Sequence, residues 1–272
     1  MTPEQTAGAA RASVSEIGTA FSEAPRTLRR ARLLGLSGWA FHVAGRAGAL
    51  GDVRAETAAA VLGFIAPEAV ADGWDGARRV ASPVDIAGHN LAECCRWGVD
   101  NLGDFPRVAR LVELAGRVVA AADAAGMPLF AAWRAMPVPD DSPGARAAAL
   151  LLLLREHRAG AHLLAVRASG MTPLEAIIAG PEGEGGALAY GWTPPFPPAE
   201  PLIRRSLWAD AVADGITAGA YAALGTAERV ELVGLLESVL AGLRAVPVGN
   251  GDPNGPVGGR PGPGSQHADR SP

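Results

Sequence analysis

The longest predicted helix of the chain has the sequence SPGARAAALLLLLREHRAGAHLLAVRAS, residues 142–169. Ser142 followed by Pro143 is typical of a helix start, because serine accepts a free backbone N–H and proline is tolerated at the first helical position. Gly170 is the matching stop signal. The apolar run within this helix, 147–154, is far shorter than the ~20 residues of a membrane span. We therefore expect a long helix that does not cross a membrane.

Helical signals recur on both sides of this stretch. Ser82-Pro83 repeats the start signal, and Thr172 with Glu175 has the spacing of a capping box. The expected helices are 26–50, 55–64, 82–102, 106–125, 172–180 and 226–245, the last with an amphipathic stripe. Alternating strand patterns of useful length are missing from the sequence. The sequence therefore predicts an all-α, multi-helix fold with little or no β-sheet.

The remaining segments suggest how the chain is divided. Residues 1–20 are expected to be a flexible N-terminus, followed by a main helical domain over 21–190. A Pro-rich connector over 191–203 would lead into a C-terminal helical segment, 204–247. The Gly- and Pro-rich end, 248–272, has no periodic apolar residues and is expected to be a disordered tail.

The composition excludes some classes of protein. Hydrophobic residues make up 49% of the 272 residues, which is too many for a wholly disordered chain. The net charge of -4 and a pI of about 5.8 argue against a strongly basic nucleic-acid binder. All 24 cationic residues are arginine, so an anion site would use arginine. The adjacent Cys94 and Cys95 are expected to be reduced thiols, and no signal peptide is visible, which favours a cytoplasmic protein.

Charged residues interrupt the long helix after its leucine run. At ~100° per residue, Arg155, Arg158 and His162 fall within an arc of about 60°. Two guanidinium groups and an imidazole on one face could hold an anion. Glu156 and His157 are expected to point elsewhere. The alternative is a salt-bridged stretch where the helix crosses between lobes.

A metal site on this helix is disfavoured by spacing. Zinc-binding helices place two ligands four residues apart, on one face. His157 and His162 are five residues apart, about 140° around the helix, so they cannot chelate from one side. We assign no metal ligand and no catalytic residue, and the sequence leaves the cofactor unknown.

A second candidate face lies on the helix predicted over 26–50. Trp39, His42 and Arg46 share one stripe and could form one wall of a ligand pocket. The alternative is that Trp39 belongs to the hydrophobic core and that His42 lies at its edge with its hydrogen-bonding groups satisfied. If the two helices are neighbours, the two faces could oppose each other across a cleft.

Several motifs resemble the actinobacterial SalK-like helix-turn-helix family. They are Leu154-Arg155-Glu156-His157-Arg158 with Gly160 and His162, Tyr190-Gly191-Trp192, Gly38-Trp39 and Gly45-Arg46. The resemblance covers about residues 25–245 and implies a mostly helical protein of two packed, winged-helix-like lobes. This chain has Ala159-Gly160-Ala161 where the family usually has Gly-Asp-Gly, so it resembles a degenerate member.

These observations favour a helix-turn-helix-like protein that binds a small anionic ligand and regulates transcription. The alternative is an enzyme of specialised metabolism that uses His and Arg for acid–base chemistry. A third reading is a helical scaffold in which the polar motif only ties two lobes together. The candidate ligand-binding residues are Trp39, His42, Arg46, Arg155, Glu156, Arg158, His162 and Trp192. DNA binding is weakly supported, no membrane contact is expected, and a homodimer through 226–245 is a candidate.

Overall fold

The computed structural model describes residues 1–138 and 142–245. Within these residues the chain forms thirteen α-helices, two short 3-10 helices and no strand, which confirms the predicted all-α class. The helices are α1 (Pro3–Ala20), α2 (Pro25–Leu33), α3 (Gly38–Ala47), α4 (Ala55–Leu62), α5 (Pro67–Arg78), α6 (Pro83–Leu102), α7 (Val108–Ala121), α8 (Pro128–Ala135), α9 (Pro143–Ala168), α10 (Pro173–Ala179), α11 (Gly183–Ala189), α12 (Ile203–Tyr221) and α13 (Thr226–Ala245). None of the helices described is long and apolar enough to cross a membrane.

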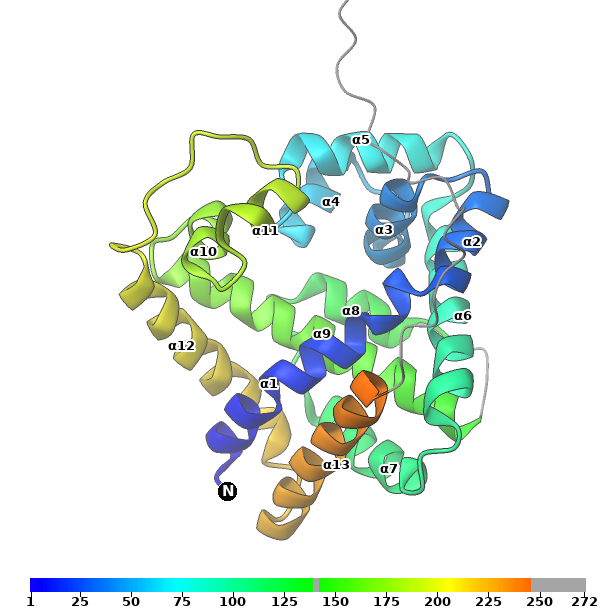
Figure 1. Cartoon of the computed structure of the whole chain (residues 1–272), viewed down its shortest axis with the longest axis vertical. Helices are drawn as coiled ribbons and strands as arrows, with labels where there is room; N and C mark the ends of the chain where they lie inside the picture. Colours follow the sequence, from blue (N-terminus) through cyan, green and yellow to red (C-terminus); the bar gives the residue numbers. More distant parts are fainter. Residues whose placement is uncertain (139–141, 246–272) are drawn as a thin grey trace, which may run out of the picture.

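The long helix α9 runs through the middle of the molecule (Figure 1). It contacts α6, α12, α1 and α7, and most of its length is therefore buried. The start signals read from the sequence are correct: Ser82, Ser142 and Thr172 each cap a helix, and Thr172 completes a capping box with Glu175. Buried hydrophobic side chains from α1 to α13 join in one cluster around this helix.

Helices α6 and α9 cross at backbone contact. A Cβ atom built on Gly98 would lie 2.3 Å from the carbonyl oxygen of Gly144, and one on Gly144 would lie 2.5 Å from that of Gly98. Both distances are too short for any side chain, so glycine is required on both helices. The close crossing fixes α6 against α9.

Two expectations about the N-terminal half are wrong. Residues 3–20 are helix α1 instead of a flexible end: Thr2 and Gln5 form a capping box, and Val14 and Ile17 are buried. The helix expected over 26–50 is broken, because Gly35 has a φ of +77° and ends α2. A new helix, α3, then begins behind the cap Ser37.

Four tryptophans join distant segments of the chain through their indole N–H groups. The acceptors are backbone carbonyl oxygens far away in the sequence. The pairs are Trp39 with Ala69 at 2.8 Å, Trp74 with Val53 at 3.1 Å, Trp133 with Arg46 at 3.0 Å and Trp192 with Phe64 at 2.9 Å. These bonds position the segments that line the cavities described below.

The segments named in the predicted division of the chain can be located in this arrangement. The Pro-rich segment lies between α11 and α12, which begins at Ile203. The domain boundaries themselves stay a prediction, and the tail expected over 248–272 lies outside the described residues. A β-hairpin wing has no counterpart among residues 1–138 and 142–245.

Candidate anion-binding cleft

A buried ion-pair group joins α3 to α9. Arg46 of α3 donates two hydrogen bonds to Glu156, from Nε to Oε1 at 2.8 Å and from Nη2 to Oε2 at 3.0 Å. Arg155 Nη1 donates to the same Oε1. The Glu156 side chain is 1% exposed and each arginine side chain 16%. Two guanidinium groups therefore share one carboxylate in this buried triad of Arg46, Arg155 and Glu156.

The charges of the buried triad do not balance. Burial acts to raise the pKa of Glu156, but the charges of Arg46 and Arg155 outweigh it and lower the pKa to about 2. Burial, and then repulsion from Arg46, lowers the pKa of Arg155. Both arginines stay protonated at neutral pH, because guanidinium pKa values exceed ~12. The buried triad thus carries a net positive charge.

His42 lies beside the buried triad and does not add to its charge. Its ring stacks on Trp39 with the ring centres 5.8 Å apart. Burial, together with the nearby charges of Arg46 and Arg155, lowers the pKa of His42 to about 4. At neutral pH the imidazole is neutral, so it can accept as well as donate a hydrogen bond.

A central cleft opens onto this group. One part, of about 420 Å³, is lined by His42, Arg46, Arg155, His162 and Tyr190. A second part, of about 590 Å³, shares Arg155, His162 and Tyr190 and extends along α1 and α12. The two predicted faces therefore do meet in one cleft, with α1 as an additional wall.

The remaining charged residues of the LREHR segment have other partners. Arg158 Nη2 lies 3.1 Å from Asp214 Oδ1, and His162 Nδ1 lies 3.5 Å from Asp210 Oδ1. Arg11 also contacts Asp210, at 3.0 Å. Two arginines face two aspartates here, so this cluster between α9, α1 and α12 is balanced. Of the three residues predicted on one face, Arg155 therefore belongs to the buried triad, whereas Arg158 and His162 belong to a structural salt-bridge cluster. His162 also lines the cleft.

Glu156 and the two candidate tryptophans, Trp39 and Trp192, have partners within the chain. Glu156 was expected to point away from the arginines, and that is wrong: it lies between them, because Arg46 reaches it from another helix. Trp39 and Trp192 use their N–H groups to hold Ala69 and Phe64. Trp192 therefore fixes Phe64, which itself lines the cleft.

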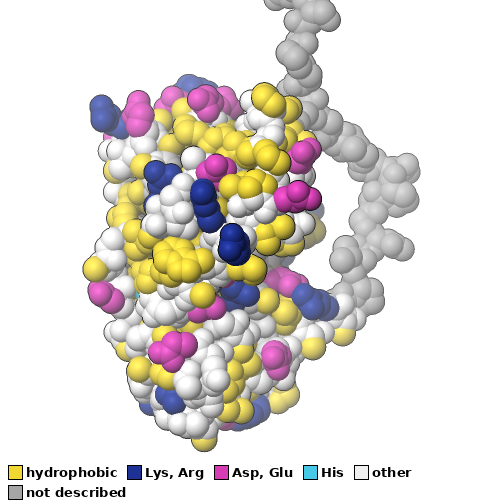
Figure 2. Space-filling view, turned by 90° about the vertical axis from the view of Figure 1, so that its left-hand side faces the viewer, with side chains coloured by type: hydrophobic (Ala, Val, Ile, Leu, Met, Phe, Trp, Pro, Cys, Tyr) yellow, Lys and Arg dark blue, Asp and Glu magenta, His cyan; other side chains and the backbone are white. Residues whose placement is uncertain are grey.

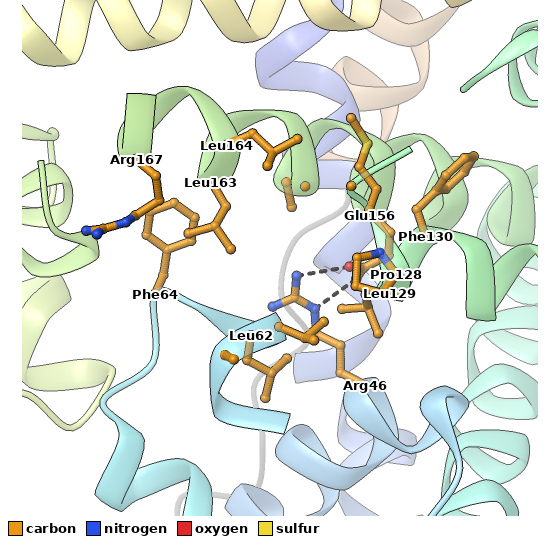
Figure 3. Close-up of a pocket in the computed structure, with 16 residues that line it drawn as sticks. Arg46, Leu62, Phe64, Pro128, Leu129, Phe130, Glu156, Leu163, Leu164 and Arg167 are labelled. Atoms are coloured by element: carbon orange, nitrogen blue, oxygen red, sulfur yellow. Dashed lines mark hydrogen bonds and ion pairs between the residues drawn. The ribbon is translucent and has the colours of Figure 1, made fainter. Parts of the chain in front are cut away.

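An apolar cavity lies on the other side of Arg46 (Figure 3). It has a volume of about 360 Å³ and lies between α4, the start of α8 and the second half of α9. Its walls include Leu62, Phe64, Leu129, Phe130, Leu163 and Leu164. Sequence reasoning missed these residues, because apolar side chains on three helices give no signal of the space between them. Tyr190, also missed, was part of the quoted Tyr190-Gly191-Trp192 motif.

The described residues provide no metal centre: they contain no group of three or more His, Cys, Asp and Glu side chains that could hold an ion. The part of the cleft next to the buried triad is lined by two arginines, two imidazoles and apolar groups together with Glu182. Glu16 and Asp210 line only its second part. The lining next to the buried triad suits an organic anion.

Comparison with known proteins gives one match. The sequence profile of a helix-turn-helix family matches residues 7–248, almost the whole chain. No curated protein and no solved structure matches.

Proposed function

The chain belongs to this helix-turn-helix family, and on that premise we propose that it is a regulatory protein whose central cleft binds a small anionic ligand. The single observation that carries the proposal is the unbalanced buried triad, in which two guanidinium groups share one carboxylate. Among the described residues, Arg46 Nη1 and Arg155 Nη2 have no protein acceptor. A ligand carboxylate or phosphate would supply both the acceptor and the missing negative charge.

The matching experiment replaces one arginine and leaves a balanced pair. Arg155→Met keeps the side-chain stem that packs on Gly18 and leaves Arg46 paired with Glu156. We expect benzoate, acetate or inorganic phosphate to bind the parent protein in isothermal titration calorimetry. In the variant the affinity should fall about tenfold or more, the worth of a charge-assisted hydrogen bond.

The control is Arg79→Met, which removes an exposed arginine beyond the end of α5. It changes the net charge of the protein equally and should leave the affinity unchanged. Equal binding of the anions by parent and Arg155→Met would contradict the proposal. Failure of all three anions to bind the parent would contradict it as well.

DNA contact is the part of the proposal that concerns transcription. Helix α2 contains four arginines in nine residues and is joined to α3 by a short turn. Arg26 and Arg30 pair with Asp100 and Glu93, whereas Arg29 and Arg32 are exposed. Exposed cations on one helix can meet phosphates. A mobility shift of generic duplex DNA at low salt, lost in the Arg29→Ala/Arg32→Ala variant, is expected. No shift at micromolar protein would remove DNA from the proposal.

The enzyme alternative has one observation in its favour. His42 is neutral and lies beside Arg46 and Arg155. It can therefore act as a base toward a ligand that the two arginines hold. Mass spectrometry of a retained ligand before and after incubation would detect its conversion. An unchanged ligand mass would speak against this alternative.

The other partner assignments are also proposals. The apolar stripe of α13 packs inside the chain, with Leu236 and Val239 buried, so it is not free for a homodimer. The face in Figure 2 has hydrophobic patches beside arginines, and α12 exposes Leu207 and Trp208. We propose the exposed part of α12 as the surface through which a homodimer forms. A cytoplasmic location and a specific kinship with SalK-like proteins stay predictions.

A further inference from the structure

The apolar cavity is built to enclose a nonpolar body. Its volume of about 360 Å³ falls within the range of small-molecule sites, about 300–1,000 Å³. Met127, Pro128, Leu129 and Phe130 form one wall, at the start of α8, and Leu163 and Leu164 of α9 form another. Figure 3 shows Leu163 and Leu164 on one side and Pro128, Leu129 and Phe130 on the other, with the Arg46–Glu156 pair between them. Most of the cavity lining is therefore apolar, and the Arg46–Glu156 pair adds a charged group to it.

Arg46 is shared between this cavity and the central cleft. Its Nε and Nη2 atoms are used by Glu156, and the remaining Nη1 has no acceptor among the described residues. The other arginine of the cavity, Arg167, donates to the carbonyl oxygen of Met171 and points away from the space in Figure 3. An anionic group bound at Arg46 therefore has the apolar cavity next to it.

We propose that the ligand is an amphipathic carboxylate, with its acid group at Arg46 and Arg155 and its acyl chain or ring in the apolar cavity. This inference rests on the proposed anion site and adds the chemical class of the ligand. A purely polar anion would leave the apolar walls in contact with water. An apolar chain removes that contact, which is favourable in proportion to the area covered.

The test is a series of straight-chain acids from acetate through butanoate and hexanoate to decanoate, measured by isothermal titration calorimetry. We expect the Kd to fall about fourfold for each added methylene until the cavity is full, the gain for burying one such group. Octanol, which lacks the acid, should bind much more weakly than octanoate.

A variant at an exposed residue of the cavity lining tests the apolar part of the site separately from the arginines. Ala60 of α4 is exposed and lines the cavity, so Ala60→Trp can fill the space without disturbing the core. We expect this variant to bind octanoate no better than butanoate, with acetate unaffected. The control Ala109→Trp places the same side chain on an exposed position of α7. Arg155→Met should instead weaken every acid by a similar factor.

The outcomes distinguish the two proposals. If all acids bind equally well and Ala60→Trp changes nothing, the apolar cavity does not take the ligand and the anion site alone survives. If octanol binds as tightly as octanoate, the acid contributes nothing and both proposals fail. If no acid of any length binds, the anion site fails and the amphipathic ligand fails with it.

Discussion

Glu156→Gln removes the carboxylate that holds Arg46 and Arg155 together. The parent carboxyl is 1% exposed, and its pKa is lowered from 4.5 to about 2. A difference of this size is worth roughly 3 kcal/mol of folding free energy at neutral pH. Losing one member of a buried ion pair costs about 3–5 kcal/mol, because the partner charge stays buried. We therefore expect the variant to lose about 3 kcal/mol or more at pH 7.

The loss of stability in Glu156→Gln should depend on pH in a definite direction. The folded state of the parent has the lower pKa, so the stabilisation by Glu156 is complete above pH 4.5 and is lost as the pH falls toward 2. The deficit of Glu156→Gln relative to the parent should therefore shrink on acidification. An added anion such as benzoate should stabilise the variant more than the parent, because it compensates two unneutralised guanidinium groups.

Urea unfolding at pH 7, 4 and 3, followed by circular dichroism, measures the deficit directly. The control is Glu16→Gln, which breaks an exposed pair with Arg244 and should cost less than about 1 kcal/mol. A Glu156→Gln deficit below about 1 kcal/mol would refute the reasoning, since a buried pair should cost several times more. A deficit that is the same at pH 3 as at pH 7 would refute it too.

Two further predictions concern the same helices. The pKa of His42 is lowered from 6.5 to about 4, so the parent should lose up to about 3 kcal/mol as the pH falls through this range. His42→Gln should abolish that part of the decline in urea unfolding at pH 7, 5 and 4, and an unchanged decline would assign it elsewhere. Gly98→Ala would place its Cβ 2.3 Å from the Gly144 oxygen and should lower stability by about 3 kcal/mol or more. Gly234→Ala on α13 has open space and should gain about 0.5–1 kcal/mol, so equal thermal melting of the two would contradict the close crossing.

Helix boundaries were predictable where a single residue type fixes the local backbone. The Ser-Pro and Thr-Pro starts of α6, α9 and α10 are correct, because a cap and a proline act within one turn. The N-terminal helix α1 was missed although Thr2 and Gln5 carry a capping box. Its many alanines give a weak apolar stripe, and its helix is stabilised by packing on α9, α12 and α13.

The site was predictable only in part, for a related reason. Arg46 and Arg155, both singled out from helical spacing, line the cleft, and their role in binding a ligand stays a proposal. The direction of Glu156 depends on Arg46, 110 residues earlier in the chain, which spacing along one helix cannot reveal. The separation of the buried triad from the salt-bridge cluster likewise depends on α12, whose Asp210 and Asp214 meet α9 at His162 and Arg158.

Trp133 donates a hydrogen bond to the carbonyl oxygen of Arg46, so its intrinsic fluorescence can report on the site. Trp133 is buried in α8 and bonds directly to the backbone that supports the shared arginine. Its indole emission depends on the local field and on that hydrogen bond, so occupancy of the arginine by an anion would shift or quench the fluorescence. Replacing Trp97 and Trp208 by phenylalanine would reduce the background emission and keep the indole hydrogen bonds of Trp39, Trp74 and Trp192, and a ligand could then be found by titration without a label.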